Sequence, residues 1–131
     1  LSFTALKLGA NCTYAVDTDS LAISATKINS ALNNFPENLI NVVLGSIEEL
    51  ELNIPEKKVD LLLCNILTPV IKSLGPSFEK IIGHKGKVIL SGLLVDQIKE
   101  LEEFFSFLGW KVLEIKTKDH WALIVITLKS S

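Results

Sequence analysis

Apolar and polar residues alternate along the chain in blocks that predict helices and strands in turn. Leu1–Leu8 is typical of a helix that the following glycine ends, and Cys12–Val16 is β-branched and aromatic enough to form a strand that stops at Asp17. Either Asp19 or Ser20 can cap the next helix. Three- and four-residue spacing predicts one buried face for that helix, made of Leu21, Ala25, Ile28 and Leu32.

The middle of the chain predicts two further strands. Asn41–Leu44 is a short strand that the pair Gly45-Ser46 closes, and the polar stretch Glu48–Lys58 is a connection with room for a helical turn. Val59–Cys64 is an almost continuously apolar run, which is typical of a parallel-sheet strand that is covered on both faces. This strand is expected to end at Asn65.

A helix follows that Pro76 should kink or divide, because proline cannot supply the amide hydrogen of a helix interior. Its buried face is predicted to hold Ile71, Leu74, Phe78, Ile81 and Ile82. Gly83 and Gly86 then bracket a turn before a strand over Lys87–Leu90.

The last part of the chain predicts one more helix and a hairpin. The pair Ser91-Gly92 precedes the clearest amphipathic helix, whose apolar positions are Val95, Ile98, Leu101, Phe104, Phe105 and Leu108. Gly109 ends this helix. Trp110–Lys116 and Trp121–Leu128 are two strands joined by a short polar turn, so an antiparallel hairpin should close the domain.

This order of elements predicts an α/β sheet with helices on both faces. The chain has 131 residues, which corresponds to a single domain over 1–131. Hydrophobic residues make up 48% of the sequence, and this content excludes a disordered segment because such a chain can bury a core.

Charge and hydropathy exclude several classes of protein. Thirteen basic against fifteen acidic residues leave a net charge of −2, so nucleic acid is not expected as a direct partner. The apolar runs are too short to span a membrane, and the first residues do not have the pattern of a signal peptide, so a cytoplasmic location is expected. Cys12 and Cys64 lie in apolar runs without ligand spacing, which predicts buried, reduced thiols and no metal site.

Candidate chemistry lies where the parallel strands end, because ligands of open α/β sheets bind beyond the carboxyl ends of the strands. Asp17 stands at such an end and is suited either to hold the two hydroxyls of a ribose or to cap the next helix, a role for which Asp19 is the better candidate. Asn65 offers an amide donor and a carbonyl acceptor where a buried strand ends, but on sequence alone an asparagine here is more typical of a turn.

Other polar residues offer weaker candidates. Ser91-Gly92 can be read simply as a loop, and no serine–histidine–aspartate set is suggested. His84 and His120 lie in predicted turns, where a histidine is usually solvated.

Several motifs occur in an order that resembles one known family. They are Ala5-Leu6-Lys7-Leu8-Gly9-Ala10, Ala15-Val16-Asp17-Thr18-Asp19-Ser20-Leu21-Ala22, Asp60-Leu61-Leu62-Leu63-Cys64-Asn65-Ile66-Leu67, Leu90-Ser91-Gly92-Leu93-Leu94 and Asp119-His120-Trp121. Together they resemble the catalytic domain of the PrmA family, the methyltransferases of a large-subunit ribosomal protein. The resemblance covers nearly the whole chain.

The resemblance implies a class I methyltransferase fold, S-adenosylmethionine as cofactor, and methylation of α-amino and lysine amino groups of a ribosomal protein. It also implies site residues. Asp17 would hold the ribose hydroxyls, and the adenine would be bordered by Gly45, Ser46 and Ile47. Asn65 would serve as the catalytic residue beside the cofactor, and the substrate would meet Ile66 and Leu67.

The chain also departs from this family. The family's first strand and its glycine-rich turn, which contacts the methionine end of the cofactor, would lie directly before Leu1. We therefore expect a C-terminal part of the catalytic domain, with half of the cofactor site absent and with reduced or no activity in isolation. The absent strand is central in this fold. Either the strands on its two sides pair with each other, or another chain extends the unpaired sheet edge, which would give an oligomer.

Three other functions fit the same sequence. The chain can be a methyltransferase for another acceptor, such as a glutamine amide, a small molecule or RNA, or a truncated, non-catalytic nucleoside-binding module. A nicotinamide-dependent oxidoreductase fits less well, because its glycine fingerprint would also have to lie upstream. The enzymatic interpretation requires that Asp17 and Asn65 emerge side by side at one rim of the sheet.

Overall fold

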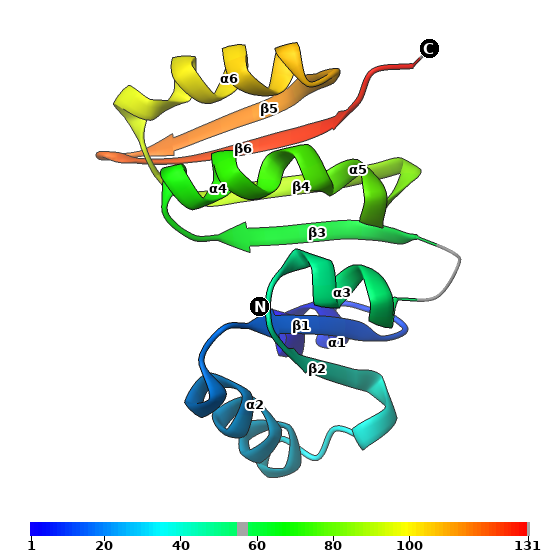
Figure 1. Cartoon of the computed structure of the whole chain (residues 1–131). Helices are drawn as coiled ribbons and strands as arrows, with labels where there is room; N and C mark the ends of the chain where they lie inside the picture. Colours follow the sequence, from blue (N-terminus) through cyan, green and yellow to red (C-terminus); the bar gives the residue numbers. More distant parts are fainter. Residues whose placement is uncertain (55–57, 131) are drawn as a thin grey trace. The chain divides into compact units, whose positions relative to one another are not determined.

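A computed structural model describes residues 1–54 and 58–130 of the chain. The chain divides into two compact units, Leu1–Pro55 and Glu56–Ser131, and each is described by itself (Figure 1). Both units consist of strands and helices in alternation, as the sequence predicts.

The first unit is built around a two-stranded parallel sheet. Strands β1 and β2 pair in register, with Asp17 opposite Leu44 at their carboxyl ends. The elements are α1 (Ser2–Lys7), β1 (Thr13–Asp17), α2 (Ser20–Leu32), a 3₁₀ turn (Glu37–Leu39), β2 (Ile40–Leu44) and α3 (Ile47–Asn53). Helix α3 replaces much of the expected connection, and Lys58 lies beyond three residues, 55–57, that fall outside the described part of the chain.

Helix α2 begins where the sequence predicts, but its buried face was predicted wrongly. Asp19 is the N-cap and accepts a hydrogen bond from the Leu21 amide at 2.8 Å. The expected face is exposed instead: Leu21 is 76%, Ile28 60% and Leu32 73% accessible. The one buried residue of this helix is Ser30, because the sheet lies against a different side of the helix than the apolar spacing indicates.

The second unit holds a four-stranded mixed sheet in the order β3-β4-β6-β5. Strands β3 and β4 are parallel, and β6 runs antiparallel to both β4 and β5. The elements are β3 (Val59–Asn65), α4 (Thr68–Leu74), a 3₁₀ turn (Gly75–Ser77), α5 (Phe78–Ile81), β4 (Ile82–Leu94), a 3₁₀ turn (Val95–Gln97), α6 (Ile98–Phe107), β5 (Trp110–Lys118) and β6 (Trp121–Leu128).

Helices α4, α5 and α6 form one layer over this sheet (Figure 1). The Phe78 ring of α5 stacks on the Phe105 ring of α6 with centroids 5.9 Å apart, and Phe105 also meets Trp110 edge-on. The predicted division at Pro76 is confirmed, since a 3₁₀ turn separates α4 from α5. The largest fully buried side chains of the chain all belong to this unit.

Three sequence predictions for strands need correction. Strand β3 is not covered along its length, because Leu61 is 45% exposed and only Cys64 is buried. Strand β4 does not stop at Leu90 but continues to Leu94, with a register shift between Leu90 and Leu93 against β6. The expected turn at 83–86 belongs to the same strand, where the pairing with β3 also shifts.

The cysteines differ from each other. Both are free thiols, and Cys64 is buried as predicted, whereas Cys12 is exposed because it precedes β1 instead of lying inside it. Burial raises the pKa of the Cys64 thiol to about 11. The hydrophobic run that holds Cys64 therefore keeps the thiol in its neutral form.

Strands β1 and β3 are edge strands of their own sheets. Within the described residues, β1 pairs with β2 alone and β3 pairs with β4 alone. None of the helices described in 1–54 and 58–130 is both long and apolar enough to cross a membrane.

Candidate functional site

The predicted cofactor residues of the first unit come together at one rim. The Gly45 amide donates a hydrogen bond to the Asp17 backbone oxygen at 2.9 Å, which joins the carboxyl ends of β1 and β2. Gly45 has a φ of +141° and leads directly into Ser46, the N-cap of α3, and Ile47, its first residue. The turn after β2 therefore lies beside the acid at the end of β1.

The Asp17 carboxylate is not a helix cap. Its Oδ1 accepts a hydrogen bond from the Asp19 amide at 2.9 Å, while Asp19 itself caps α2. Asp17 is exposed, and its carboxylate makes this one hydrogen bond within the described part of the chain, so Oδ2 is available to a ligand hydroxyl.

Glu49 is a charged neighbour of this rim that the sequence interpretation missed. Its Oε2 accepts a hydrogen bond from the Ser46 amide at 2.8 Å, and a Cβ at Gly45 would come within 2.7 Å of the Glu49 side chain. Hydrogen bonds from the backbone amides of Ser46 and of Glu49 itself lower the pKa of this carboxyl. The serine and glutamate three residues apart are a capping-box pattern, which is the signal that could have found it.

In the second unit, Asn65 is the last residue of β3 and is exposed. It pairs in register with Ser91 of β4, whose hydroxyl donates to the Cys64 backbone oxygen at 3.5 Å. Ile66 and Leu67 follow in the loop and are 36% and 74% exposed. An amide and two exposed apolar side chains thus stand together at the carboxyl end of this sheet.

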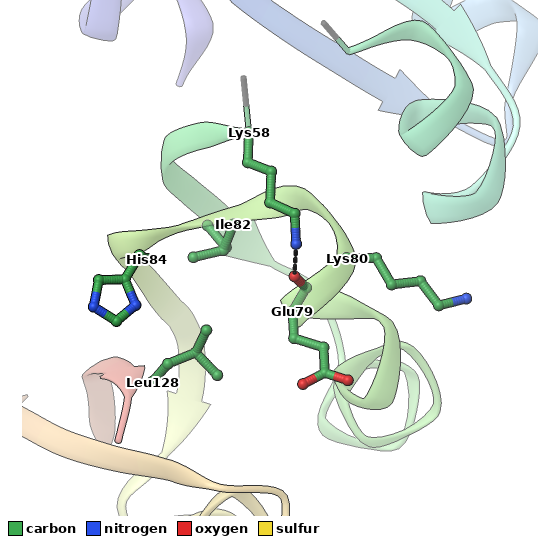
Figure 2. Close-up of a pocket in the computed structure, with 6 residues that line it drawn as sticks. All are labelled: Lys58, Glu79, Lys80, Ile82, His84 and Leu128. Carbon is green, nitrogen blue, oxygen red and sulfur yellow. Dashed lines mark hydrogen bonds between the residues drawn. The ribbon is translucent and has the colours of Figure 1, made fainter. Parts of the chain in front are cut away.

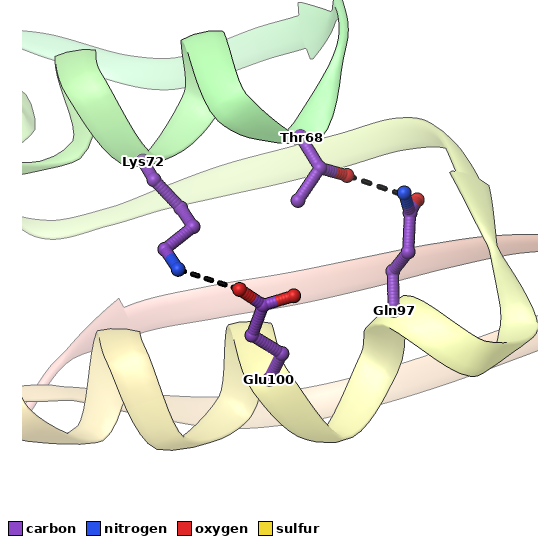
Figure 3. Close-up of polar contacts among 4 residues, drawn as sticks. All are labelled: Thr68, Lys72, Gln97 and Glu100. Atoms are coloured by element: carbon purple, nitrogen blue, oxygen red, sulfur yellow. Dashed lines mark hydrogen bonds and ion pairs between the residues drawn. The ribbon is translucent and has the colours of Figure 1, made fainter.

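Polar contacts hold the segment after Asn65 in place (Figure 3). The buried Thr68 hydroxyl donates to Gln97 Oε1 at 2.9 Å, and the same oxygen accepts from the Leu94 amide at 3.0 Å. Lys72 of α4 and Glu100 of α6 form an ion pair at 2.6 Å. The start of α4 is therefore tied to the end of β4.

A hollow of about 560 Å³ lies at the opposite rim of this unit, where β3 and β4 begin (Figure 2). It is lined by Lys58, Glu79, Lys80, Ile82, His84 and Leu128. Lys58 Nζ donates to the Glu79 backbone oxygen at 2.6 Å, and the Glu79 carboxylate points away from that amine. None of the predicted site residues lines this hollow among the residues that the structure describes.

Comparison with known proteins identifies the family. The family model for ribosomal protein L11 methyltransferase (PrmA) matches residues 1–129, through both units. The chain belongs to the PrmA family. It is 47% identical over 126 residues to the ribosomal protein L11 methyltransferase of Parasynechococcus marenigrum and 45% identical over 124 residues to that of Prochlorococcus marinus.

These PrmA relatives are longer than the chain. The match covers 96% and 95% of this chain but only 44% and 41% of the two relatives. The crystal structure of ribosomal protein L11 methylase from Lactobacillus delbrueckii subsp. bulgaricus superposes with a TM-score of 0.84 at 26% identity, covering 96% of this chain and 62% of that one. The predicted class I methyltransferase fold is therefore confirmed.

Proposed function

We propose that the chain is part of an S-adenosylmethionine-dependent N-methyltransferase that modifies amino groups of ribosomal protein L11 in the cytoplasm. The observation that supports this proposal most is the PrmA match through residues 1–129, which includes the rim at Asp17 and the rim at Asn65. No direct contact with nucleic acid or membrane is part of the proposal. The structure describes each rim within its own unit, so their adjacency stays a prediction.

The rim of the first unit fits the nucleoside half of the cofactor. Asp17 would accept hydrogen bonds from the ribose hydroxyls through its carboxylate, and the adenine would lie against Gly45, Ser46 and Ile47. Gly45 has a positive φ, which L side chains rarely adopt, and the Glu49 side chain occupies the space that a Cβ there would need, so this turn beside Asp17 requires glycine.

Methyl transfer makes modest chemical demands on the protein. S-adenosylmethionine supplies an electrophilic methyl group on a sulfonium. The lone pair of the acceptor nitrogen forms the new N–C bond while the C–S pair leaves with sulfur, and the methylated nitrogen then loses a proton to solvent. The protein mainly has to align the two groups and exclude water.

Asn65 would align the acceptor. Its side-chain or backbone oxygen accepts a hydrogen bond from the neutral amine and so aims the nitrogen lone pair, while Ile66 and Leu67 line the approach. An α-amine, with a pKa of about 7.7–8.0, is neutral at lower pH than a lysine amine near about 10.4. The rate should therefore rise with pH as each acceptor loses its proton.

Paired variants test the proposed cofactor residue. Asp17→Asn removes one carboxylate oxygen while keeping an acceptor for the Asp19 amide, and Asp19→Asn keeps the α2 cap. Calorimetry with S-adenosylhomocysteine should show about 10-fold weaker binding for Asp17→Asn, from the loss of a charge-assisted hydrogen bond, and little change for Asp19→Asn. Equal affinity of both variants and the parent would remove Asp17 from the site.

The catalytic proposal is tested with Asn65→Ala and a labelled methyl donor. Transfer to ribosomal protein L11 should fall on the order of 100-fold while S-adenosylhomocysteine binding stays unchanged. Full transfer by the variant would exclude Asn65 from the mechanism. Methylation of a glutamine-bearing peptide or of RNA, with none of L11, would instead support another acceptor.

A further inference from the structure

Gly92 lies directly beneath the side chain of Asn65. Gly92 follows Ser91, the in-register partner of Asn65, and sits in the register shift between Leu90 and Leu93. A Cβ built on Gly92 would overlap Asn65 Oδ1 and come within 3.3 Å of Asn65 Cγ. The carboxamide of Asn65 thus occupies the space that any other residue at this position would fill.

A comparison with Gly109 distinguishes the effect of this contact from the effect of the backbone conformation. Gly92 has a φ of +73°, which L side chains rarely adopt. Gly109, in the same unit, has a φ of +87°, but a Cβ there would meet nothing within 4 Å. Both positions need glycine for their backbone, and only Gly92 also faces the proposed catalytic amide.

The residues around this contact are held by strand pairing and by side-chain hydrogen bonds. Three residues after Asn65, the Thr68 hydroxyl donates to Gln97 Oε1 (Figure 3). Two residues after Gly92, the Leu94 amide donates to the same oxygen. The Ser91 hydroxyl also reaches the Cys64 backbone oxygen. The backbone on both sides of the contact is therefore held, and an added methyl group would displace the Asn65 side chain first.

We propose that Gly92 is a positioning residue. Because glycine has no side chain, the Asn65 carboxamide can lie against this point of β4, and this position sets the direction in which Oδ1 points. This inference rests on the proposed role of Asn65 in methyl transfer. A misplacement of about 1 Å in such a group is enough to lower a rate substantially.

The test is a double-mutant cycle on the full chain of the enzyme, with Gly109→Ala as the matched control for backbone strain. Gly92→Ala should lower kcat on the order of 10- to 100-fold with the KM for S-adenosylmethionine unchanged. Gly109→Ala should retain kcat within about 2-fold at a temperature where both variants are folded. In the Asn65→Ala background, Gly92→Ala should add less than about 2-fold. Equal losses in both backgrounds, or no loss in either, would overturn the proposal.

A second readout does not depend on activity. The side-chain amide resonances of Asn65 in a ¹H–¹⁵N spectrum should shift in Gly92→Ala and stay in place in Gly109→Ala. If Asn65→Ala is fully active but these resonances shift, the proposed catalysis fails while the positioning contact stands. Unshifted resonances would refute the contact itself.

If Gly92→Ala does not fold, a folding measurement on the double variant tests the proposal. Adding Asn65→Ala should then restore folding, because it removes the atoms that a Cβ would overlap. A double variant that stays unfolded while Gly109→Ala folds would count against the proposal.

Discussion

The two units bury their apolar side chains to very different extents. In the second unit, a helical layer covers a four-stranded sheet, and Phe78, Phe105 and Trp110 are at most 1% exposed. Among the described residues 1–54 of the first unit, the buried apolar ones are Ile40, Ile47 and Leu50, at 5–7% exposure. A two-stranded sheet offers little surface for packing, so a similar alternation of strands and helices produces a much smaller core.

In these two units, apolar spacing predicts a helix more reliably than it predicts which face of the helix is covered. The stripes of α2 and α6 both have the spacing of an amphipathic helix. The α6 residues Leu101 and Phe105 are fully buried, whereas the α2 residues Leu21 and Leu32 are more than 70% exposed. Both tryptophans lie in the second unit, so their fluorescence follows the unfolding of that unit.

The largest expected effect is in the core of the second unit. Phe105→Ala should reduce the free energy of unfolding by about 3–5 kcal/mol, because it leaves a cavity among three aromatic rings. Urea unfolding followed by tryptophan fluorescence measures the change. Phe107→Ala, two residues away on α6 and 90% exposed, should change it by less than about 0.5 kcal/mol. Similar losses for the two variants would contradict the assigned core.

A pH effect of roughly 2–3 kcal/mol is expected from Cys64, whose pKa is raised from 9.0 to about 11 by burial. Between these values the unfolded thiol has lost its proton and the folded thiol keeps it, so stability falls as pH rises. Urea midpoints measured from pH 8 to pH 11, with tryptophan fluorescence as the signal, should show this decline. In Cys64→Ala, the free energy of unfolding should fall less steeply with pH. If the decline is as steep as in the parent protein, groups other than Cys64 cause it.

The core of the first unit should respond less. Leu50→Ala is expected to cost about 2 kcal/mol, the lower end for a buried leucine, because few apolar neighbours surround it. Hydrogen exchange of the β1 and β2 amides follows this unit without tryptophan. Leu52→Ala, on the same helix and 85% exposed, is the matched control and should leave the exchange unchanged. If Leu50→Ala lowered the free energy of unfolding as much as Phe105→Ala, the two units would not differ in how strongly their cores stabilise them.

The smallest effect is expected at the exposed stripe of α2. Ile28→Lys should change the free energy of unfolding by less than about 0.5 kcal/mol, because Ile28 is 60% exposed. Hydrogen exchange of the α2 amides is the measurement. Destabilisation by more than about 1 kcal/mol would indicate that this face is covered in solution.

Much of the candidate site could be predicted because it depends on strand ends. The end of β1 at Asp17 and the end of β3 at Asn65 lie where the sequence indicates, and the turn after β2 joins Asp17 as expected of parallel neighbours. Glu49 was missed because the segment after Ser46 was interpreted as a connection. The sequence predicts a loop at Gly92 because a register shift inside a strand has no marker in the local sequence.

The local sequence predicted most of the helices and strands, favoured the cap at Asp19 and predicted the break at Pro76, and the order of its motifs indicated the family. These depend on residues a few positions apart, or on motifs that survive in order along the chain. Three features became visible only in the folded chain: the α2 stripe is exposed, Leu61 is exposed on an edge strand, and Gly92 lies against Asn65. Burial and cross-strand contact depend on segments distant in sequence, and their placement follows from packing and pairing that no local pattern records.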